Sequence, residues 1–445
     1  MTTQEQVLAT VKEHGIRFVD LWFTDITGGV KNVTVPASQL EKVIEQGARF
    51  DGSSLESLTR VAESDMLLMP DVETFALMPW GEGDNRTARL ICNVYTTEGR
   101  PFIGDPRAML IRMLEQAEEM GYRYKTGIEL EFFLFKGDNG SRLDANDSHT
   151  YFDLPDEKTQ TVRRAMLHTL DTMGIGVLSA HHEIGGGQHE IDFDFDSALS
   201  SADQIFSARV ALKAVAQAHG LHCTFMPRPL MNMPGNGMHT HQSLHDLETD
   251  TNVFSDADAD PEDGPRLSAT AEHFLAGQLA HAPALAAILS PLVNSYKRLG
   301  TSFEAPVYVT WAHVNRGALI RVPRVQAGKE DHTRLELRLP DPSSNPYLVA
   351  AVMLAAGLDG IRQQMPVPPP INETIVQQDR ARLRQVKVLP NSLRQALEAL
   401  QDDSVIMAAL GPYISDRYLA AKRKEYDDYS RQVTRWEMEQ YFNRY

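Results

Sequence analysis

The sequence predicts an α+β fold with a small N-terminal unit and a larger C-terminal unit, and three observations carry this prediction. Several short stretches alternate polar with apolar residues at a period of two, which is the period of a β-strand. Longer windows are typical of helices, and the first of them, over residues 4–13, is amphipathic. The segments Gly99-Arg100-Pro101 and Gly104-Asp105-Pro106 punctuate the chain and predict a boundary between residues 1–103 and 104–445.

The N-terminal unit is expected to begin with an amphipathic helix over residues 4–13. A strand over 18–23, a turn at Thr27-Gly28-Gly29 and a strand over 30–35 follow, which is the pattern of a β-hairpin. A helix over 38–46, a loop that carries Asp51 and a strand over 88–95 complete the unit.

The C-terminal unit mixes helices with the alternating strands. Helical windows cover residues 107–120, 159–173, 202–219 and 269–289. Residues 256–265 are acidic and polar, which is typical of an exposed loop, and the proline-rich residues 366–370 connect to a helical C-terminal part.

The composition is that of an ordinary globular protein and disfavours some partners. The chain has 445 residues, and 60 acidic against 43 basic residues give a formal net charge of −17. Nucleic-acid binding is disfavoured, because it normally needs a basic surface. Two cysteines, Cys92 and Cys223, exclude a disulfide framework and fit a reducing compartment. The N-terminus lacks a signal-peptide core, and the longest apolar run, 347–357, is too short to span a bilayer, so we expect a cytoplasmic protein.

Charged and imidazole side chains occupy one face of four alternating stretches. These side chains are Glu129 and Glu131; Glu190 and Asp192; His239, His241 and Ser243; and Arg334, Glu336 and Arg338. Taken alone, each stretch is equally typical of a solvent-exposed strand face or of a weak surface ion pair. A triple glycine, residues 185–187, separates Glu183 from Glu190 and permits a tight turn that brings the two carboxylates together.

Convergence of these carboxylates would require cations. Two carboxylates about 4 Å apart repel by roughly 4 kcal/mol at an effective dielectric constant near 20. Hard oxygen ligands with one or two imidazoles favour Mg²⁺ or Mn²⁺. Two metals that bridge phosphate oxygens are a recurrent arrangement in phosphoryl transfer. The stretches therefore predict a metal- and phosphate-binding cleft.

Arginines supply the complementary charge. Their guanidinium groups suit phosphates and carboxylates, which they bind through two hydrogen bonds. Neither a P-loop nor a Gly-x-Gly-x-x-Gly sequence occurs, so the common nucleotide-binding folds lack their signature. The candidate residues are Arg298, Arg316, Arg321, Arg334 and Arg338, each of which taken alone is an ordinary surface cation.

These motifs, in this order along nearly the whole chain, resemble the class I glutamine synthetases, in their short subtype. The matching segments are residues 50–54, 129–133, 181–183, 187–190, 237–239, 294–298, 304–306, 315–316, 320–321 and 345–348. The resemblance implies a β-grasp-like N-terminal domain and a catalytic α/β domain on an antiparallel, partly closed sheet. It implies an ATP-dependent ligase that forms glutamine from glutamate and ammonia through γ-glutamyl phosphate, with two or three Mg²⁺ or Mn²⁺ ions per site. No tyrosine lies between Tyr347 and Tyr413, so the adenylylation of the longer subtype is not expected.

The resemblance assigns roles residue by residue. One metal would be held by Glu131, Glu183 and Glu190, and the other by Glu129, His239 and Glu336. The remaining roles are catalysis for Asp51, Glu304, Arg316 and Arg321; substrate binding for Ser54, Tyr151, Glu183, Gly235, Arg298 and Arg338; nucleotide binding for His241, Ser243 and Arg334; and feedback regulation for Arg60.

In this family the aspartate that matches Asp51 reaches the site of a neighbouring subunit. The resemblance therefore implies a homo-oligomer, a dodecamer of two hexameric rings with small-molecule substrates, and neither a membrane nor a nucleic-acid partner.

The chain departs from the family near the glutamate and amine pockets. Pro234 replaces an asparagine expected to bind glutamate, residues 300–303 replace a Val-Pro-Gly-Tyr run, and the segment 322–334 is longer than usual. These changes leave open a ligase that joins glutamate to an organic amine such as methylamine, ethanolamine or a polyamine. A non-catalytic scaffold or regulatory relative and a dinuclear hydrolase are further alternatives, of which the hydrolase would leave the arginines unexplained.

Overall fold

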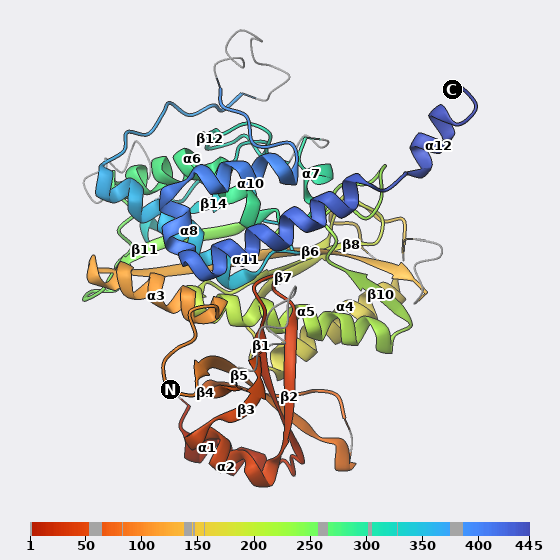
Figure 1. Ribbon diagram of the computed structural model, residues 1–445, viewed down its shortest axis with the longest axis vertical. Coiled ribbons are helices and arrows are strands. Elements are labelled where there is room, and N and C mark those ends of the chain that lie inside the picture. Colours follow the sequence, from red (N-terminus) through yellow and green to blue (C-terminus); the bar gives the residue numbers. More distant parts are fainter. Residues whose placement is uncertain are drawn as a thin grey trace.

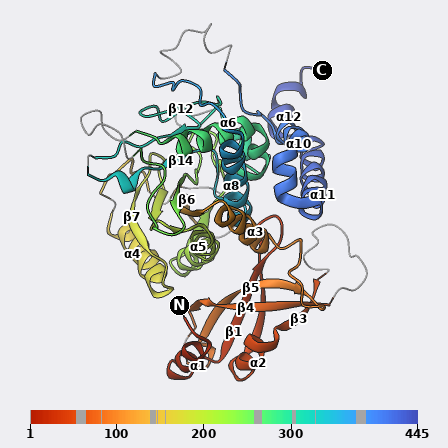
Figure 2. The same ribbon diagram turned by 90° about the vertical axis from the view of Figure 1, so that its left-hand side faces the viewer.

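The computed structural model describes residues 2–52, 65–81, 83–137, 145, 147–154, 156–256, 266–300, 305–326, 328–373 and 386–445. Two β-sheets and the helices around them confirm the predicted α+β class (Figures 1 and 2). The small unit lies below the larger one in both views. Among the helices of the described residues, none combines the length and apolar character that crossing a membrane requires.

The small unit is a five-stranded sheet in the order β2-β1-β5-β4-β3. Its strands are β1 (Phe18–Thr24), β2 (Val30–Pro36), β3 (Ala48–Asp51), β4 (Asp65–Leu77) and β5 (Thr87–Thr96). The predicted hairpin is confirmed, because β1 and β2 pair antiparallel, whereas β1 and β5 pair parallel. Helices α1 (Gln4–Glu13) and α2 (Leu40–Gln46) belong to the same unit. The predicted loop at Asp51 was wrong, since Asp51 ends strand β3.

A larger sheet forms the centre of the second unit, in the order β12-β13-β14-β11-β6-β8-β7, with β9 and β10 also paired to β6. The strands are β6 (Tyr122–Lys136), β7 (Val177–His182), β8 (Gln188–Phe193), β9 (Asp196–Ser197), β10 (Leu221–Thr224), β11 (Thr240–Asp246), β12 (Trp311–Ala312), β13 (Ile320–Arg321) and β14 (Leu335–Leu337). All pairs except β12 with β13 are antiparallel, as the resemblance implied.

Helices surround this sheet and bury its apolar side. They are α3 (Pro106–Glu119), α4 (Glu157–Thr172), α5 (Ala198–Ala218), α6 (Ala269–Leu289), α7 (Ser295–Arg298), α8 (Pro346–Gln363), α10 (Leu393–Asp402), α11 (Ser404–Ser430) and α12 (Arg435–Tyr441). Gly277 of α6 lies so close to α8 that a Cβ there would collide with the carbonyl of Ala356. The predicted helices are confirmed, although α5 begins four residues earlier than expected. The predicted loop at 256–265 lies, apart from Asp256, outside the described residues.

His281 ties three of these helices together. Its Nδ1 lies 2.7 Å from a carboxylate oxygen of Asp403, and its Nε2 lies 3.2 Å from one of Asp359. Burial opposes the charged imidazole, but the hydrogen bonds and charges of Asp403 and Asp359 outweigh it and raise the pKa of His281. The three side chains are mostly buried, so the network joins α6, α8 and the N-cap of α11.

Replacement of His281 by alanine is expected to lower the free energy of unfolding by about 1–3 kcal/mol. A raised folded-state pKa makes this contribution complete below the unfolded value of about 6.5 and removes it as pH rises through the folded value. Thermal unfolding of both proteins at pH 6 and at pH 9 measures this. The difference in Tm should be larger at pH 6, and an equal difference at both values would contradict a charged His281.

Candidate active site

Strand β6 is the spine of the site. Glu129 and Glu131 share one face of it, and the register with β8 places Glu131 opposite Glu190. Strand β11 lies on the other side of β6, and the carbonyl of His239 accepts a hydrogen bond from the backbone N–H of Glu129 at 3.0 Å. The period of two therefore brings carboxylates and imidazoles from three neighbouring strands to one face, as predicted.

The triple glycine closes the turn between β7 and β8. The N–H of Gln188 donates to the carbonyl of Gly185 at 2.8 Å, and the N–H of Glu183 donates to the carbonyl of Gln188 at 2.8 Å. Gly187 has a φ of 71°, a conformation that favours glycine. The turn thereby carries Glu183 to the same cavity as Glu190.

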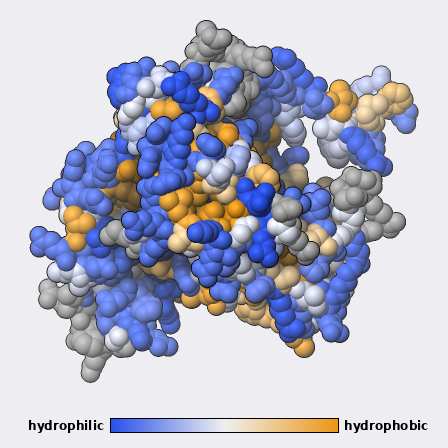
Figure 3. All heavy atoms as spheres, turned by 90° about the horizontal axis from the view of Figure 1, so that it is seen from below, coloured by the Kyte–Doolittle hydropathy of each residue, from blue (hydrophilic) through white to orange (hydrophobic). Residues whose placement is uncertain are grey.

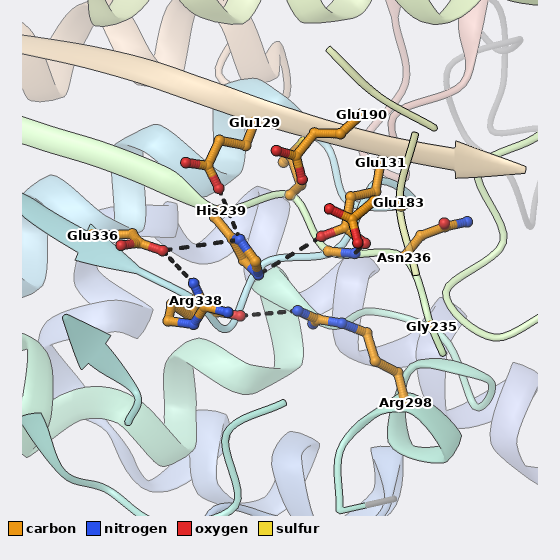
Figure 4. A network of polar contacts seen from close by, with 12 residues as sticks. Glu129, Glu131, Glu183, Glu190, Gly235, Asn236, His239, Arg298, Glu336 and Arg338 are labelled. Carbon is orange, nitrogen blue, oxygen red and sulfur yellow. Dashed lines mark hydrogen bonds and ion pairs between the residues drawn. The ribbon is translucent and has the colours of Figure 1, made fainter. Parts of the chain in front are cut away.

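Glu131, Glu183 and Glu190 form the first carboxylate group (Figure 4). Burial, and then the charges of Glu190 and Glu183, raise the pKa of Glu131 well above its usual range. Burial, and then the charges of Glu129 and Glu183, raise the pKa of Glu190 to about 10. Burial and mutual repulsion therefore disfavour the ionised forms of Glu131 and Glu190, and a divalent cation would supply the counter-charge that favours them.

A second group surrounds Glu129. Its two carboxylate oxygens lie 3.0 Å from Nδ1 of His239 and 2.7 Å from Nε2 of His241, and Nδ1 of His239 lies 3.9 Å from Glu336. Burial, and then the nearby charge of Arg338, lower the pKa of His239 to about 4, which leaves its imidazole neutral and able to bind a metal. His241, expected at the nucleotide, thus also contacts the predicted metal ligand Glu129.

Arginines line the opposite side of the site. Arg321 and Arg338 both form ion pairs with Glu336, which is fully buried. Nη1 and Nη2 of Arg298 donate to the carbonyls of Leu339 and Arg338, at 2.9 and 3.0 Å. Burial raises the pKa of Tyr151, although its hydrogen bond to Arg316 acts in the opposite direction. Cationic and anionic groups therefore face each other across one space.

The glycine-rich approach to β11 packs tightly against these groups. A Cβ at Gly237 would lie 2.7 Å from Nε2 of His239 and 3.0 Å from Oε1 of Glu131, so a larger residue there would displace these side chains. The N–H of Gly237 donates to Glu131 at 2.9 Å. The neighbouring Asn236 is buried and bonds to Gln188 and the carbonyl of Met226, and the cavity lining does not include it. Asn236 therefore does not compensate for the asparagine that Pro234 replaces.

A cavity of about 650 Å³ contains these residues. Its lining includes the expected residues Glu129, Glu131, Tyr151, Glu183, Glu190, Gly235, His239, Arg298, Arg316, Arg321, Glu336 and Arg338. A second cavity, of about 450 Å³, shares Glu129 and Asp192 with the first and is lined by His241, Ser243 and Arg334. Nε of Arg334 donates to His241 at 3.2 Å. The structure thus brings the predicted nucleotide residues together beside the carboxylates.

Four candidate residues are not placed in either cavity. Asp51 is exposed at the edge of the small sheet and does not line the catalytic cavity of its own chain. Ser54, Arg60 and Glu304 lie outside the described residues, as do residues 301–303 of the departing loop.

Sequence reasoning missed several residues that support the site. Nε2 of His181 lies 3.1 Å from Glu190. His181 precedes Glu183 by two residues in the sequence, and this strand spacing could have predicted that both lie at the site. Gln188 donates to Glu131 at 3.1 Å. Oδ1 of Asp147 lies 2.8 Å from Nε2 of His182 and accepts from the N–H of Gly187 at 3.0 Å, which anchors the turn. No local pattern connects Asp147 to that turn.

Comparisons with known proteins agree with this geometry. A family model described as the glutamine synthetase catalytic domain matches residues 103–441, and one described as the glutamine synthetase β-grasp domain matches residues 15–97. A glutamine synthetase of Halobacterium salinarum is 46% identical over 99% of this chain and 97% of its own length. One of Thermus thermophilus is 45% identical over 100% of this chain and 99% of its own length.

Solved structures are similar over the whole chain as well. "Apo GmaS without ligand" has a TM-score of 0.85 and 33% sequence identity, and "GmaS/ADP complex-Conformation 1" has a TM-score of 0.86 and 32% identity. Both comparisons cover 100% of each chain.

Proposed function

The chain belongs to the glutamine synthetase family, and from this premise we propose how the residues of its two cavities catalyse the formation of glutamine from glutamate, ammonia and ATP. It is a glutamate–ammonia ligase of the short form, with a β-grasp N-terminal domain. We further propose a domain boundary near residue 103, the roles of single residues, the identity of the cations and the assembly.

One observation carries the proposal. Three carboxylates, of which Glu131 and Glu190 have raised pKa values, face a set of arginines across a single cavity, and the second cavity shares Glu129 with it. Such an arrangement suits the transfer of a phosphoryl group between two anionic molecules, because cations and guanidinium groups must neutralise both. A scaffold has no need of convergent buried carboxylates, and a hydrolase would leave the arginines without a role.

The first step is transfer of the γ-phosphoryl group of ATP to the γ-carboxylate of glutamate. Glu131, Glu183 and Glu190 would hold one Mg²⁺ or Mn²⁺ ion, and Glu129, His239 and Glu336 another; a third ion is compatible with the family. Bound divalent cations would neutralise the transferring phosphate. Arg321 and Arg316 would stabilise the charge that develops on its oxygens, which requires Arg321 to exchange its pairing with Glu336 for the phosphate.

Substrate recognition uses the remaining lining residues. Arg338 and Arg298 would bind the carboxylate groups of glutamate, and the carbonyl of Gly235 would accept from its ammonium group. Tyr151 and Glu183 would bind ammonium before it attacks the acyl phosphate. ATP would occupy the second cavity, with its phosphates toward Glu129 and with His241, Ser243 and Arg334 along it.

The site is proposed to be completed by a second copy of the chain. Asp51 is exposed and does not line the cavity of its own chain, so we assign it to the cavity of a neighbouring copy. Helix α12 projects from the body (Figure 1) and exposes Trp436, Tyr441 and Phe442. Apolar residues also gather near the middle of the lower face (Figure 3). These surfaces support a ring-forming homo-oligomer, which by analogy with the family we propose to be a dodecamer. We propose the cytoplasm as its location.

The reaction is tested by product analysis. Purified protein with ATP, Mg²⁺, glutamate and ammonium is expected to release one phosphate for each glutamine formed, and omission of any one component should abolish both products. Phosphate release that does not depend on ammonium and yields no glutamine would contradict the proposed ligase.

A second candidate acceptor is an organic amine. Pro234, which stands where the family has an asparagine, lines the catalytic cavity together with Met231, Asn232 and Met233, and Met231 is 81% exposed. Solved structures described as GmaS are similar over the whole chain. In the same assay, methylamine, ethanolamine and a polyamine replace ammonium. A kcat/KM higher for one of the amines than for ammonium would identify that amine as the acceptor. Turnover with ammonium and with none of the amines would exclude an organic amine as the acceptor.

A further inference from the structure

Two imidazoles lie on the back of the strands that carry the catalytic carboxylates. His182 ends β7 and pairs with His189 of β8, and in the same ladder His181 pairs with Glu190. Because successive side chains of a strand point to opposite faces, His182 and His189 lie on the face that is turned away from Glu190. Their ring centroids are 4.9 Å apart. Neither residue lines the catalytic cavity or the second cavity, so the pair is separate from the site described above.

Asp147 adds a carboxylate to this pair. Its Oδ1 lies 2.8 Å from Nε2 of His182, and the side chains of Asp147 and His182 are 3% and 0% exposed. One ring nitrogen from each histidine and one oxygen of Asp147 all lie within 4.8 Å of one another. Ligand atoms bound tetrahedrally to Zn²⁺ at 2.0–2.2 Å are about 3.4 Å apart. Closure of the three side chains by roughly 1 Å would therefore give the geometry of a metal site.

His189 is the member of this cluster that hydrogen bonding does not explain. It is 1% exposed, and neither of its ring nitrogens has a hydrogen-bond partner in the part of the chain that the structure describes. Its ring packs against Phe132, with the centroids 5.7 Å apart. Burial of unpaired polar atoms is costly, and an apolar side chain would pack there without that cost. A ligand for these nitrogens would account for a histidine at this position.

Both ring nitrogens of His182 face oxygen acceptors. Nδ1 lies 2.7 Å from the carbonyl oxygen of Glu183, and Nε2 faces Asp147. A neutral imidazole has a single N–H, so donation to Glu183 leaves the lone pair of Nε2 directed at a carboxylate oxygen. A cation at this position removes the repulsion. A proton would serve His182 and Asp147 alone, whereas a metal ion would also bind His189.

We propose that Asp147, His182 and His189 bind a structural divalent transition-metal ion, with Zn²⁺ as the ion that fits this ligand set best. Two imidazole nitrogens and one carboxylate oxygen suit Zn²⁺, whereas Mg²⁺ prefers oxygen ligands. Water would supply the fourth ligand. The proposal does not depend on the cations assigned to the catalytic cavity or on the reaction.

The ion would fasten the hairpin that presents the catalytic carboxylates. Asp147 already accepts a hydrogen bond from the N–H of Gly187 in the turn between β7 and β8, at 3.0 Å. Glu183 follows His182 directly, and Glu190 follows His189. One ion would thus hold the backbone on both sides of the turn from behind, as outer-shell groups hold the ligands of a metal. We expect it to act on stability and on the affinity for the catalytic cations.

Zinc analysis of the assembled protein tests the site. After equilibration with Zn²⁺ in a large excess of Mg²⁺ and removal of free ions, mass spectrometry should find one tightly bound zinc ion per chain. Anomalous diffraction at the zinc edge should place it among Asp147, His182 and His189. Zn²⁺ at a hundredfold excess over its Kd should raise Tm by roughly 3 °C. Absence of retained zinc, or zinc found only among the catalytic carboxylates, would overturn the proposal.

A pair of variants separates this site from the catalytic cavity. His189→Phe removes a ligand but keeps an aromatic ring against Phe132, so the bound zinc and the rise of Tm with Zn²⁺ should both be lost. Glu131→Gln, the matched control, alters the catalytic carboxylates and should retain the zinc. If His189→Phe retained zinc as the wild-type protein does, His189 would not be a ligand.

Asp147→Asn provides a second test that does not alter the packing of His189. The asparagine keeps an oxygen that can accept from the N–H of Gly187, so the turn should be preserved. Loss of the negative charge should raise the Kd for Zn²⁺ by more than tenfold. An unchanged Kd would show that Asp147 serves the turn and not a metal ion.

Discussion

Glu131→Gln is expected to lower kcat/KM for glutamine synthesis by roughly 10³-fold or more, since loss of an outer-shell partner of a metal ligand already costs 10–100-fold. The residue is 7% exposed, and its side chain keeps two donors, the N–H of Gly237 and the amide of Gln188. The substitution preserves shape but removes one of three neighbouring negative charges. Steady-state kinetics and Mn²⁺ binding, measured by electron paramagnetic resonance, should change together.

Asp192→Asn is the matched control for this variant. Asp192 lies on β8 opposite Glu129 and lines both cavities, but it is not among the proposed metal ligands. The Asp192→Asn variant should bind Mn²⁺ almost as tightly as the wild-type protein. If Glu131→Gln retained both activity and Mn²⁺ affinity, the first carboxylate group would not be a metal site.

Asp51→Ala is expected to abolish most glutamine formation while it leaves binding of ATP and glutamate nearly intact. The reason is its position, since Asp51 is exposed on the small sheet and absent from the lining of its own chain's cavity. Asp51→Ala and Glu131→Gln should therefore complement each other when they are unfolded and reassembled together. Random mixing in equal amounts should place both wild-type residues in about one quarter of the shared sites.

Each variant reassembled alone provides the control for complementation. If both residues belonged to the same chain's site, mixing would restore nothing, since each chain carries one defect. Activity near one quarter of the wild-type value would instead require a site between subunits.

The sequence predicted the parts of the site that depend on a local period. The alternation in β6, in β8 and in the stretch that leads into β11 placed Glu131, Glu190 and His239 on one face, and the glycines before Gln188 predicted the turn. The limits of α1 followed from its amphipathic pattern, and those of α6 from a long window free of strand alternation. These features are set by neighbours in the chain, so one sequence suffices to find them.

Features that depend on distant contacts could not be predicted in this way. Strand β4 was missed because Pro70 and Asp71 interrupt its pattern, and its pairing with β5 is irregular between Asp71 and Ala76. The anchoring of the turn by Asp147 joins residues 40 positions apart. Arg107 of α3 forms ion pairs with Asp71 of the small unit and with Asp203 of α5, and no local pattern connects these residues.

The two carboxylate groups are proposed to hold divalent cations against the terminal phosphate of ATP. Anomalous diffraction from crystals grown with Mn²⁺ and a non-hydrolysable ATP analogue would locate these cations. We expect one manganese peak among Glu131, Glu183 and Glu190, and a second among Glu129, His239 and Glu336, with the γ-phosphate between them. A map with the analogue bound but no manganese at either group, and with the acidic side chains turned apart, would contradict it.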